Sequence, residues 1–197
     1  RFNMKQQRSY LFLAPGFEEI EALATVDVLR RAGMEVCTVA VNNGSISVKG
    51  AHGVSVEADI LDSDADFSDA EWLICPGGMP GATNLAESPV VTNALKEQFS
   101  RGGKIAAICA SPAIVLEPLG ILAGKSATCY PGMEGYIKSA DTVNTPVVAH
   151  DSLITGNGPA STIGFALAIV RNSMGEDVAK ETGTAMLFYP DTSKFYF

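Results

Sequence analysis

The stretch KIAAICASPAIVL, residues 104–116, decides the fold predicted for this chain. Its apolar run at 105–108 predicts a short strand buried on both faces, as strands of parallel sheets are. Ser111 and Pro112 predict the start of a helix, because serine caps helix N-termini and the missing N–H of proline needs no partner in the first turn. Cys109 lies at the joint, where a thiol faces outward at the positive end of the helix dipole, as in a nucleophile elbow. The alternative is that Cys109 is a small buried apolar residue.

The length and composition predict a single globular domain. The chain has 197 residues, 47% of them hydrophobic, so we expect one domain over residues 1–197 with tails at 1–8 and 190–197. A formal net charge of -8 provides no basic stripe to neutralise phosphates, so neither nucleic acid nor a membrane surface is expected as a partner. No apolar run approaches the length that crosses a membrane.

The four cysteines indicate a reducing compartment. Cys37, Cys75, Cys109 and Cys129 show no CxxC spacing, and three of them fall inside apolar, strand-like runs. Such usage is typical of reduced thiols in a cytoplasmic protein and not of a disulfide framework or a zinc site.

The rest of the chain predicts strands that alternate with helices. Strands are predicted at 9–14, 34–41, 72–75 and 126–130, helices at 18–32, from 79 to about 101, after 156–159 and at 176–187, a ribbon at 45–58, and a hairpin of 147–149 with 153–155. The acid-rich segment 59–71 is predicted to be a solvated connection. This order predicts an α/β fold with a mostly parallel sheet, helices on both faces, and a site at the carboxyl ends of the strands.

Neither the acidic residues at the start of the helix at 18–32 nor the two histidines need a catalytic explanation. Glu18, Glu19 and Glu21 crowd the first turn of the helix at 18–32, where the helix dipole favours acidic side chains. His150 precedes the strand at 153–155, so it lies at the far edge of the sheet from Cys109 if that strand is parallel to the one before Cys109. His52 falls in the ribbon and cannot be placed, so a Cys-His-acid triad is not expected.

The order of several motifs resembles the ThiJ/PfpI superfamily, and most closely its deglycase branch. The similar segments are LICPGGMPGATNLAESP, AAICASP, TGNGPAST and APGFEEIEA, and the similarity runs from Tyr10 to Leu187. The resemblance implies a flavodoxin-like three-layer sandwich that forms a homodimer. It also implies an enzyme that needs no cofactor and no metal.

The same resemblance implies the residues of the site. Cys109 matches the reactive cysteine, Glu21 its partner glutamate, and Gly78 and Ala110 the residues whose N–H groups form an oxyanion hole. The rim of the site is expected to comprise Tyr130, Gly158, Pro159 and Cys129.

Three features depart from the pattern of the superfamily. Tyr130 replaces a histidine found in many relatives, and Ala110 stands where the protease branch has a histidine. The usual GPGT is replaced by GPAS at residues 158–161, a small change at the rim of the site.

The chemistry of a reactive thiol constrains the state of Glu21. A thiol with a pKa near 8.5 is only about 3% ionised at pH 7, and making it mostly thiolate requires about 3–4 kcal/mol. A helix terminus supplies at most ~2 kcal/mol. No Lys or Arg adjoins Cys109, and an ionised Glu21 would oppose the thiolate. We therefore expect Glu21 to be protonated, to donate to the sulfur, and to lower the thiol pKa.

Three functions remain open at this stage. The resemblance favours a glyoxalase or deglycase that acts on small reactive aldehydes such as methylglyoxal. The alternative is a non-enzymatic oxidative-stress sensor or chaperone that works through oxidation of Cys109, which Tyr130 favours because a phenol is a poor base near pH 7. An amidase or peptidase is the least expected, for want of a histidine.

Overall fold

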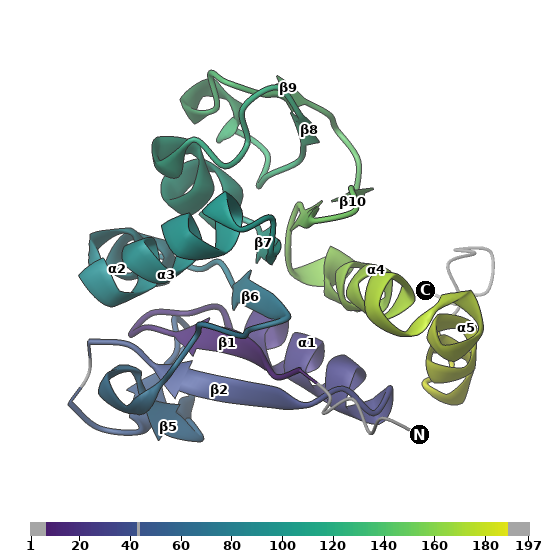
Figure 1. Cartoon of the computed structure of the whole chain (residues 1–197), viewed down its shortest axis with the longest axis horizontal. Helices are drawn as coiled ribbons and strands as arrows, with labels where there is room; N and C mark the ends of the chain where they lie inside the picture. The colour runs from purple at the N-terminus through teal and green to yellow at the C-terminus, as the bar shows by residue number, and fades with distance from the viewer. Residues whose placement is uncertain (1–6, 43, 189–197) are drawn as a thin grey trace.

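A seven-stranded sheet forms the centre of the computed structural model, which describes residues 7–42 and 44–188 (Figure 1). Its order is β10-β11-β7-β6-β1-β2-β5, and neighbours are parallel except β10 and β11. The strands are β1 (Ser9–Leu13), β2 (Val36–Ala40), β5 (Ile60–Leu61), β6 (Trp72–Cys75), β7 (Lys104–Ile108), β10 (Val147–Ala149) and β11 (Leu153–Gly156). The central strands are buried throughout and, apart from Ser9 and Thr38, apolar, which is why they lie inside a parallel sheet.

Helices cover both faces of this sheet (Figure 1). One face carries α1 (Glu19–Arg31) and α4 (Thr162–Met174), with α5 (Glu176–Ala185) packed on α4. The other face carries α2 (Gly81–Glu87), α3 (Pro89–Ser100) and a helical turn at Pro112–Leu116. Alternate residues of β1 enter the two cores: Phe12 packs on the face covered by α2 and α3, and Leu11 on the face covered by α1 and α4. The predicted three-layer α/β sandwich is confirmed.

Of two further predictions, the ribbon at 45–58 is confirmed and the connection at 59–71 is partly wrong. The ribbon is present as β3 (Ser47–Lys49) and β4 (Ser55–Glu57), which pair antiparallel. The prediction that 59–71 is only a solvated connection is wrong at its start, because Ile60 of β5 pairs with Val39 of β2. The two residues of β5 are too few for any periodicity to indicate a strand.

The helix predicted from 79 to about 101 is two helices. Ser88 ends α2 and caps α3, with its Oγ accepting the N–H of Val91 at 3.3 Å. Pro89 lacks the N–H that would continue α2, so the chain starts a new helix there.

The strand predicted at 126–130 is also shorter than expected. Only β8 (Ser126–Ala127) is a strand, and it pairs with β9 (Asp141–Thr142) outside the main sheet. The N–H of Thr128 donates instead to Thr155 Oγ1 at 3.0 Å, and that of Tyr130 to the carbonyl of Cys109 at 2.8 Å. The segment therefore crosses the end of β7 instead of extending the sheet.

The helical segment after Cys109 is irregular. Pro112–Leu116 forms a π-helical turn and Glu117–Leu119 a 3-10 turn. Pro118 cannot donate to the carbonyl of Ile114, so a regular α-helix cannot continue there. Further 3-10 turns lie at Asp62–Asp64, Glu134–Tyr136 and Pro159–Ser161.

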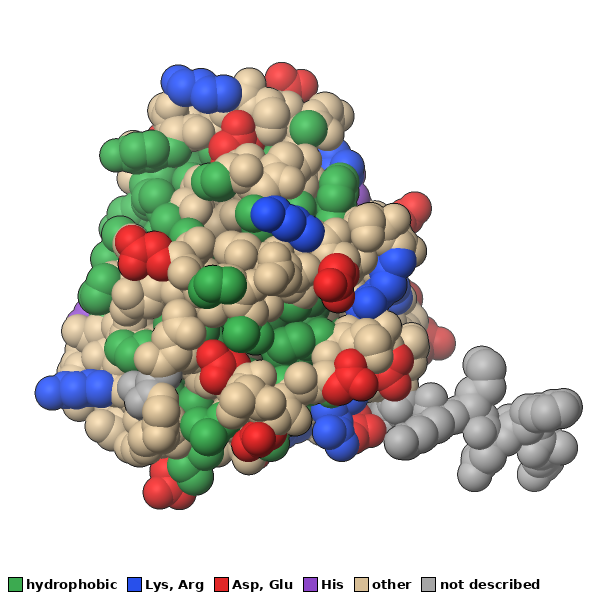
Figure 2. All heavy atoms as spheres, turned by 60° about the vertical axis from the view of Figure 1, so that its left-hand side comes forward, with side chains coloured by type: hydrophobic (Ala, Val, Ile, Leu, Met, Phe, Trp, Pro, Cys, Tyr) green, Lys and Arg blue, Asp and Glu red, His purple; other side chains and the backbone are tan. Residues whose placement is uncertain are grey.

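The surface carries mixed charges (Figure 2), and only part of the predicted tails falls within the described residues. In the part of the chain that the structure describes, no helix is long and apolar enough to cross a membrane. Figure 2 shows acidic, basic and hydrophobic side chains interspersed on one face of the molecule. Of the predicted tails, Gln7 and Arg8 bond to Asp69 and Glu35, while 1–6 and 190–197 lie outside the described residues.

Candidate active site

Cys109 lies directly after β7, in a backbone conformation that few residues other than glycine adopt. Its φ is 65°, a left-handed conformation that costs an L-residue of order 1 kcal/mol or more. Its N–H donates to the carbonyl of Gly156 at 2.9 Å, and its carbonyl accepts the N–H of Tyr130 at 2.8 Å. These two bonds hold the sharp turn expected of a nucleophile elbow.

Small residues make room for this turn. A Cβ on Gly77 would lie 2.5 Å from Cys109 Cβ and 2.7 Å from Glu21 Oε1, so only glycine fits between them. Ser111 is buried, and its Oγ donates to the carbonyl of Pro76 at 2.6 Å. The loop after β6 and the turn after β7 are thereby joined.

Glu21 projects from the first turn of α1 into the same space. Its side chain is completely buried, and Oε1 accepts the N–H of Gly77 at 3.0 Å. Oε2 is buried and has no hydrogen-bond partner at standard geometry among the described residues, so it is the oxygen free to carry a proton. Burial raises the pKa of Glu21 to about 7, with a further contribution from the charge of Glu18 and an opposing one from the Cys109 thiol.

The thiol of Cys109 is 8% exposed and interacts with Glu21. Burial and the charge of an ionised Glu21 raise its pKa to about 12, which is opposite to the low thiol pKa expected from the sequence. The reason is that a buried carboxylate and a buried thiolate cannot both be charged without strong repulsion. The pair therefore retains one proton near neutral pH, and a proton on Glu21 Oε2 removes the repulsion.

Two backbone N–H groups face the sulfur. Those of Gly78 and Ala110 bond to the Cys109 side chain and lower its pKa. Gly78 has a φ of 89°, and a Cβ there would lie 2.4 Å from the N atom of Glu18. The site thus brings together all four residues that the resemblance implied at its centre, Cys109, Glu21, Gly78 and Ala110.

The four residues expected at the rim differ in exposure. Tyr130 is half-exposed, and its ring lies 3.6 Å from where a Cβ on Gly158 would be. Pro159 follows and begins a 3-10 turn. Cys129 is buried, with 4% of its surface exposed. Burial, with a contribution from Glu134, raises the pKa of the Cys129 thiol to about 11.

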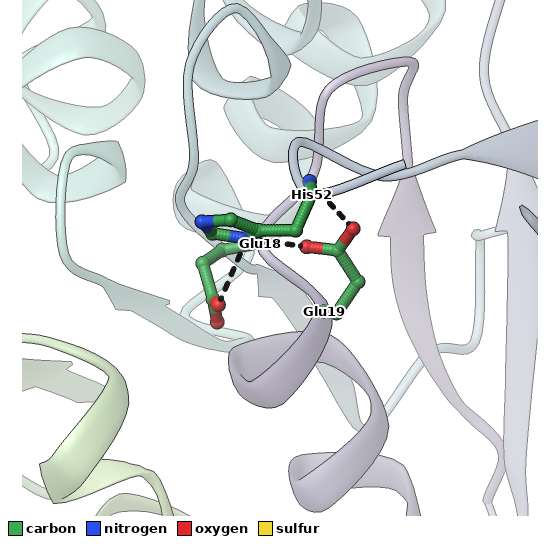
Figure 3. Close-up of side chains that lie close together, drawn as sticks. All are labelled: Glu18, Glu19 and His52. Atoms are coloured by element: carbon green, nitrogen blue, oxygen red, sulfur yellow. Dashed lines mark hydrogen bonds and ion pairs between the residues drawn. The ribbon is translucent and has the colours of Figure 1, made fainter. Parts of the chain in front are cut away.

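Glu18 and Glu19 are more than the exposed first-turn charge that the sequence suggested, because they are only 7% and 9% exposed (Figure 3). Glu18 caps α1, with Oε2 accepting the N–H of Glu21 at 2.7 Å. Glu19 Oε2 lies 2.9 Å from Nδ1 of His52. Nothing in the sequence indicated this pair, because the two residues lie 33 positions apart.

The same three residues are the candidate metal ligands. One ligand atom each from Glu18, Glu19 and His52 lie within 4.8 Å of one another. Glu18 already accepts the N–H of Glu21, and Glu19 those of His52 and Val54. These bonds make the cluster a contact between α1 and the ribbon.

Neither histidine adjoins Cys109. Nε2 of His150 lies 2.9 Å from the carbonyl of Ser126. The parallel pairing of β11 with β7 places His150 at the far edge of the sheet, as predicted. His52 is engaged by Glu19. Cys109 therefore has a carboxyl partner and no imidazole partner among the described residues.

Comparisons with known proteins agree with the motifs. The DJ-1/PfpI family model matches residues 7–172. Glutathione-independent glyoxalase DJR-1.2 of Caenorhabditis elegans is 38% identical over 181 residues, covering 88% of this chain and 93% of that protein. The structure of oxidized Toxoplasma gondii DJ-1 matches with a TM-score of 0.89 at 35% identity, over 92% of this chain and 98% of that one.

Some relatives are much longer. Protein DJ-1 homolog B of Arabidopsis thaliana is 38% identical over 175 residues, which are 89% of this chain and 40% of that protein. This chain therefore spans less than half the length of that relative. The family match over residues 7–172 and the similarity to DJR-1.2 over nearly its full length lead to one conclusion: the chain belongs to the DJ-1/PfpI family.

Proposed function

We propose that this chain is a glyoxalase that converts methylglyoxal or glyoxal into the corresponding 2-hydroxy acid through Cys109 and Glu21. The observation that carries the proposal is the fully buried Glu21, whose pKa of about 7 suits it both to give and to take a proton at neutral pH. A relative that resembles this chain over nearly its full length is named a glutathione-independent glyoxalase. The deglycase reaction would use the same groups.

The first step joins substrate and enzyme. The sulfur of Cys109 adds to the aldehyde carbon, and the aldehyde oxygen becomes negative as its double bond opens. The N–H groups of Gly78 and Ala110 stabilise this oxygen, which takes the proton of Glu21. The product is a hemithioacetal beside an ionised Glu21.

The second step moves hydrogen between carbons. The Glu21 carboxylate removes the proton from the carbon bound to sulfur and returns it to the neighbouring carbonyl carbon. The hydroxyl proton of the hemithioacetal passes to the oxygen of the neighbouring carbon at the same stage, so the carbon bound to sulfur is oxidised to a thioester and its neighbour is reduced to an alcohol. Water hydrolyses the thioester, which releases the hydroxy acid and restores the thiol, so no outside oxidant or reductant is needed.

Methylglyoxal turnover tests this function. Wild type is expected to consume methylglyoxal without glutathione or added metal, and Cys109→Ala to stop doing so. Equal, slow consumption by both proteins contradicts the proposal.

A second candidate function is redox sensing through Cys109. Tyr130 occupies the rim position where many relatives have a histidine, and a phenol is a poor base near pH 7. A sulfinate at Cys109 would accept hydrogen bonds from the N–H groups of Gly78 and Ala110 and from a protonated Glu21. Mild peroxide followed by peptide mass spectrometry is expected to find Cys109 oxidised before Cys37 and Cys75. Oxidation of all four thiols to the same extent argues against this function.

We also propose that the protein is a cytoplasmic homodimer. Its four cysteines are free and buried, which suits a reducing compartment. Ile20 and Leu23 of α1 expose 55% and 38% of their surface on one side of the helix, which suits a second subunit.

A further inference from the structure

One aromatic ring is anchored beside the thiol of the site. The N–H of Tyr130 donates to the carbonyl of Cys109 at 2.8 Å, so the two backbones are in direct contact. The ring of Tyr130 reaches Gly158, where a Cβ would lie 3.6 Å from Cδ2 and 3.8 Å from Cε2 of the ring. Gly158 follows Gly156 by two residues, and the carbonyl of Gly156 accepts the N–H of Cys109 at 2.9 Å. The ring therefore lies between the two segments that hold the Cys109 backbone.

This ring is only half covered by the protein. Tyr130 is 49% exposed, although most of a tyrosine ring is apolar and gains free energy on burial. Its backbone is fixed on both sides, because its carbonyl also accepts the N–H of Met133 at 3.0 Å. An open aromatic surface on a fixed backbone, next to a nucleophile, is suited to stack with a flat apolar group of a substrate.

The segments that meet at Cys109 carry no basic side chain. They are residues 14–18, 76–80, 109–112, 128–133 and 156–161, all within the described part of the chain. The acids at this edge are Glu18 and Glu21, both buried, while His52 of the ribbon is already paired with Glu19. A negatively charged substituent would therefore meet acidic groups and find no free cation in these segments, whereas an uncharged substituent would not be repelled.

We propose that Tyr130 makes this a site for uncharged α-oxoaldehydes that carry a flat apolar substituent, namely aryl glyoxals. The sulfur of Cys109 adds to the aldehyde carbon as described above, and the aryl group on the neighbouring carbonyl carbon stacks on the open side of the Tyr130 ring. Methylglyoxal has only a methyl group at that position and gains little from the ring. The inference names the substrate class of the proposed function and rests on that function for turnover only.

The first test is the ratio of kcat/KM for phenylglyoxal to that for methylglyoxal. Wild type is expected to prefer phenylglyoxal, and Tyr130→Ala to lower the ratio about 10-fold, as loss of an aromatic pair does. Tyr130→Phe is expected to keep the ratio, because it retains the ring and removes only the hydroxyl. Cys109→Ala supplies the blank for reaction of the aldehydes with other side chains.

The second test needs no turnover. Bromoacetophenone and bromoacetone have the carbon skeletons of phenylglyoxal and methylglyoxal, and in both the sulfur of Cys109 displaces bromide. Each alkylation rate is measured by peptide mass spectrometry and divided by the rate for 2-mercaptoethanol, which removes the intrinsic difference between the reagents. The normalised ratio, phenyl to methyl, is expected to be about 10 in wild type and Tyr130→Phe, and near one in Tyr130→Ala.

A charged reagent tests the second half of the proposal. 4-(Bromoacetyl)benzoic acid places a carboxylate on the same ring, and its normalised rate at Cys109 is expected to be roughly 5-fold below that of bromoacetophenone.

Two further variants keep the tests decisive. Phe99→Ala removes a ring that is 43% exposed near the end of α3, just before β7 begins and so at the opposite edge of the sheet from Cys109. It is expected to leave every ratio unchanged. Tyr130→Leu keeps an apolar side chain without the flat ring, and it is expected to give the low ratio of Tyr130→Ala with the thermal melting temperature of wild type.

Three alkylation results overturn the role of the ring: a normalised ratio near one in wild type, an equal ratio in wild type and Tyr130→Ala, or a ratio in Tyr130→Phe as low as in Tyr130→Ala. Equal normalised rates for the charged and neutral reagents overturn the exclusion of anions. A wild type that turns over neither aldehyde refutes the glyoxalase, and the alkylation ratios then still decide the role of Tyr130.

Discussion

At the scale of single residues, the site depends on where one proton lies. Glu21 has a buried oxygen that finds no hydrogen-bond partner among the described residues, and burial together with the charge of Glu21 raises the pKa of the Cys109 thiol. Because the thiol titrates above the pKa of Glu21, the carboxylate is ionised when the sulfur loses its proton and opposes that loss. Glu21→Gln and Glu21→Leu both remove this charge, and Gln also keeps a donor to the sulfur. Titration of the thiol by ultraviolet absorbance should therefore give a pKa at least a unit below that of wild type in the Gln variant, about 1.4 kcal/mol, and a smaller decrease in the Leu variant.

The opposite result is equally informative. A higher thiol pKa in Glu21→Leu means that Glu21 keeps its proton and donates it to the sulfur while the thiol ionises. Glu87→Gln, at an exposed acid of α2, is the matched control and should leave the thiol pKa unchanged.

The raised pKa of Glu21 also predicts how stability varies with pH. The pKa of Glu21 is about 7 in the folded protein, whereas in the unfolded chain it is near its ordinary value of 4.5. Between these values the unfolded state binds fewer protons, so the contribution of Glu21 to stability is present below 4.5 and declines as the pH rises to about 7. Relative to Glu21→Gln, wild type should lose about 3 kcal/mol across this window.

Urea unfolding of both proteins at several pH values measures this loss. Glu87→Gln should differ from wild type by a constant amount over the same range. A constant difference between wild type and Glu21→Gln would show that the carboxyl is not shifted.

Residue identities were predictable where a local pattern or a resemblance pointed to them. Cys109 follows from an apolar run, a cysteine and a Ser-Pro helix start, and the resemblance then indicated Glu21, Gly78 and Ala110. The contact of His52 with Glu19 was not predictable, because only the folding of the hairpin onto α1 brings the two side chains together. Burial of Glu18 and Glu19 was missed for the same reason.

At the scale of elements, the errors share one physical origin. The apolar runs of β1, β6 and β7 were enough to predict these strands from the sequence. By contrast, β5 and β8 form only because they pair with strands from distant parts of the chain. The segment at 128–130 leaves the sheet direction because Thr155 accepts the N–H of Thr128 and the carbonyl of Cys109 accepts that of Tyr130. Periodicity reports which faces are buried and not which distant group accepts an N–H.

The loop after β6 supplies the prediction at this scale. Gly77→Ala places a Cβ against Cys109 and Glu21, where neither neighbour can yield, so it should cost about 1–3 kcal/mol of stability and slow alkylation of Cys109. Gly135→Ala is the control, because a Cβ there meets nothing within 4 Å. Urea unfolding and the alkylation rate check both. A Gly77→Ala protein with wild-type stability and reactivity would show that the loop is less tightly packed than its geometry indicates.

At the scale of the whole molecule, the sheet order explains where the site lies. Strands β1, β6, β7 and β11 are parallel, so the loops after β1, β6 and β7 converge at one edge. The alternation of strands and helices predicted this convergence before any contact was known. It could not predict that a hairpin from beyond β2 would pack against the same edge.

That hairpin and α1 leave an apolar surface that a second copy of the chain would cover. Ile20 and Leu23 are one turn apart on α1. Val54 of the hairpin is 51% exposed, and its N–H donates to the side chain of Glu19, the residue before Ile20. Light scattering at micromolar concentration should give twice the chain mass of 20.7 kDa. Ile20→Glu, which buries a charge in the proposed interface, should give the mass of one chain.

Val90→Glu is the matched control. Val90 is 38% exposed on α3, which packs on the other face of the sheet, so its charge should leave the mass unchanged. A wild type that scatters as one chain removes the dimer altogether. A dimer that Ile20→Glu does not dissociate would retain the assembly but place its interface away from the start of α1. Only an interface at α1 would bring the second subunit next to the turn that carries Glu21, and so link assembly to the chemistry at Cys109.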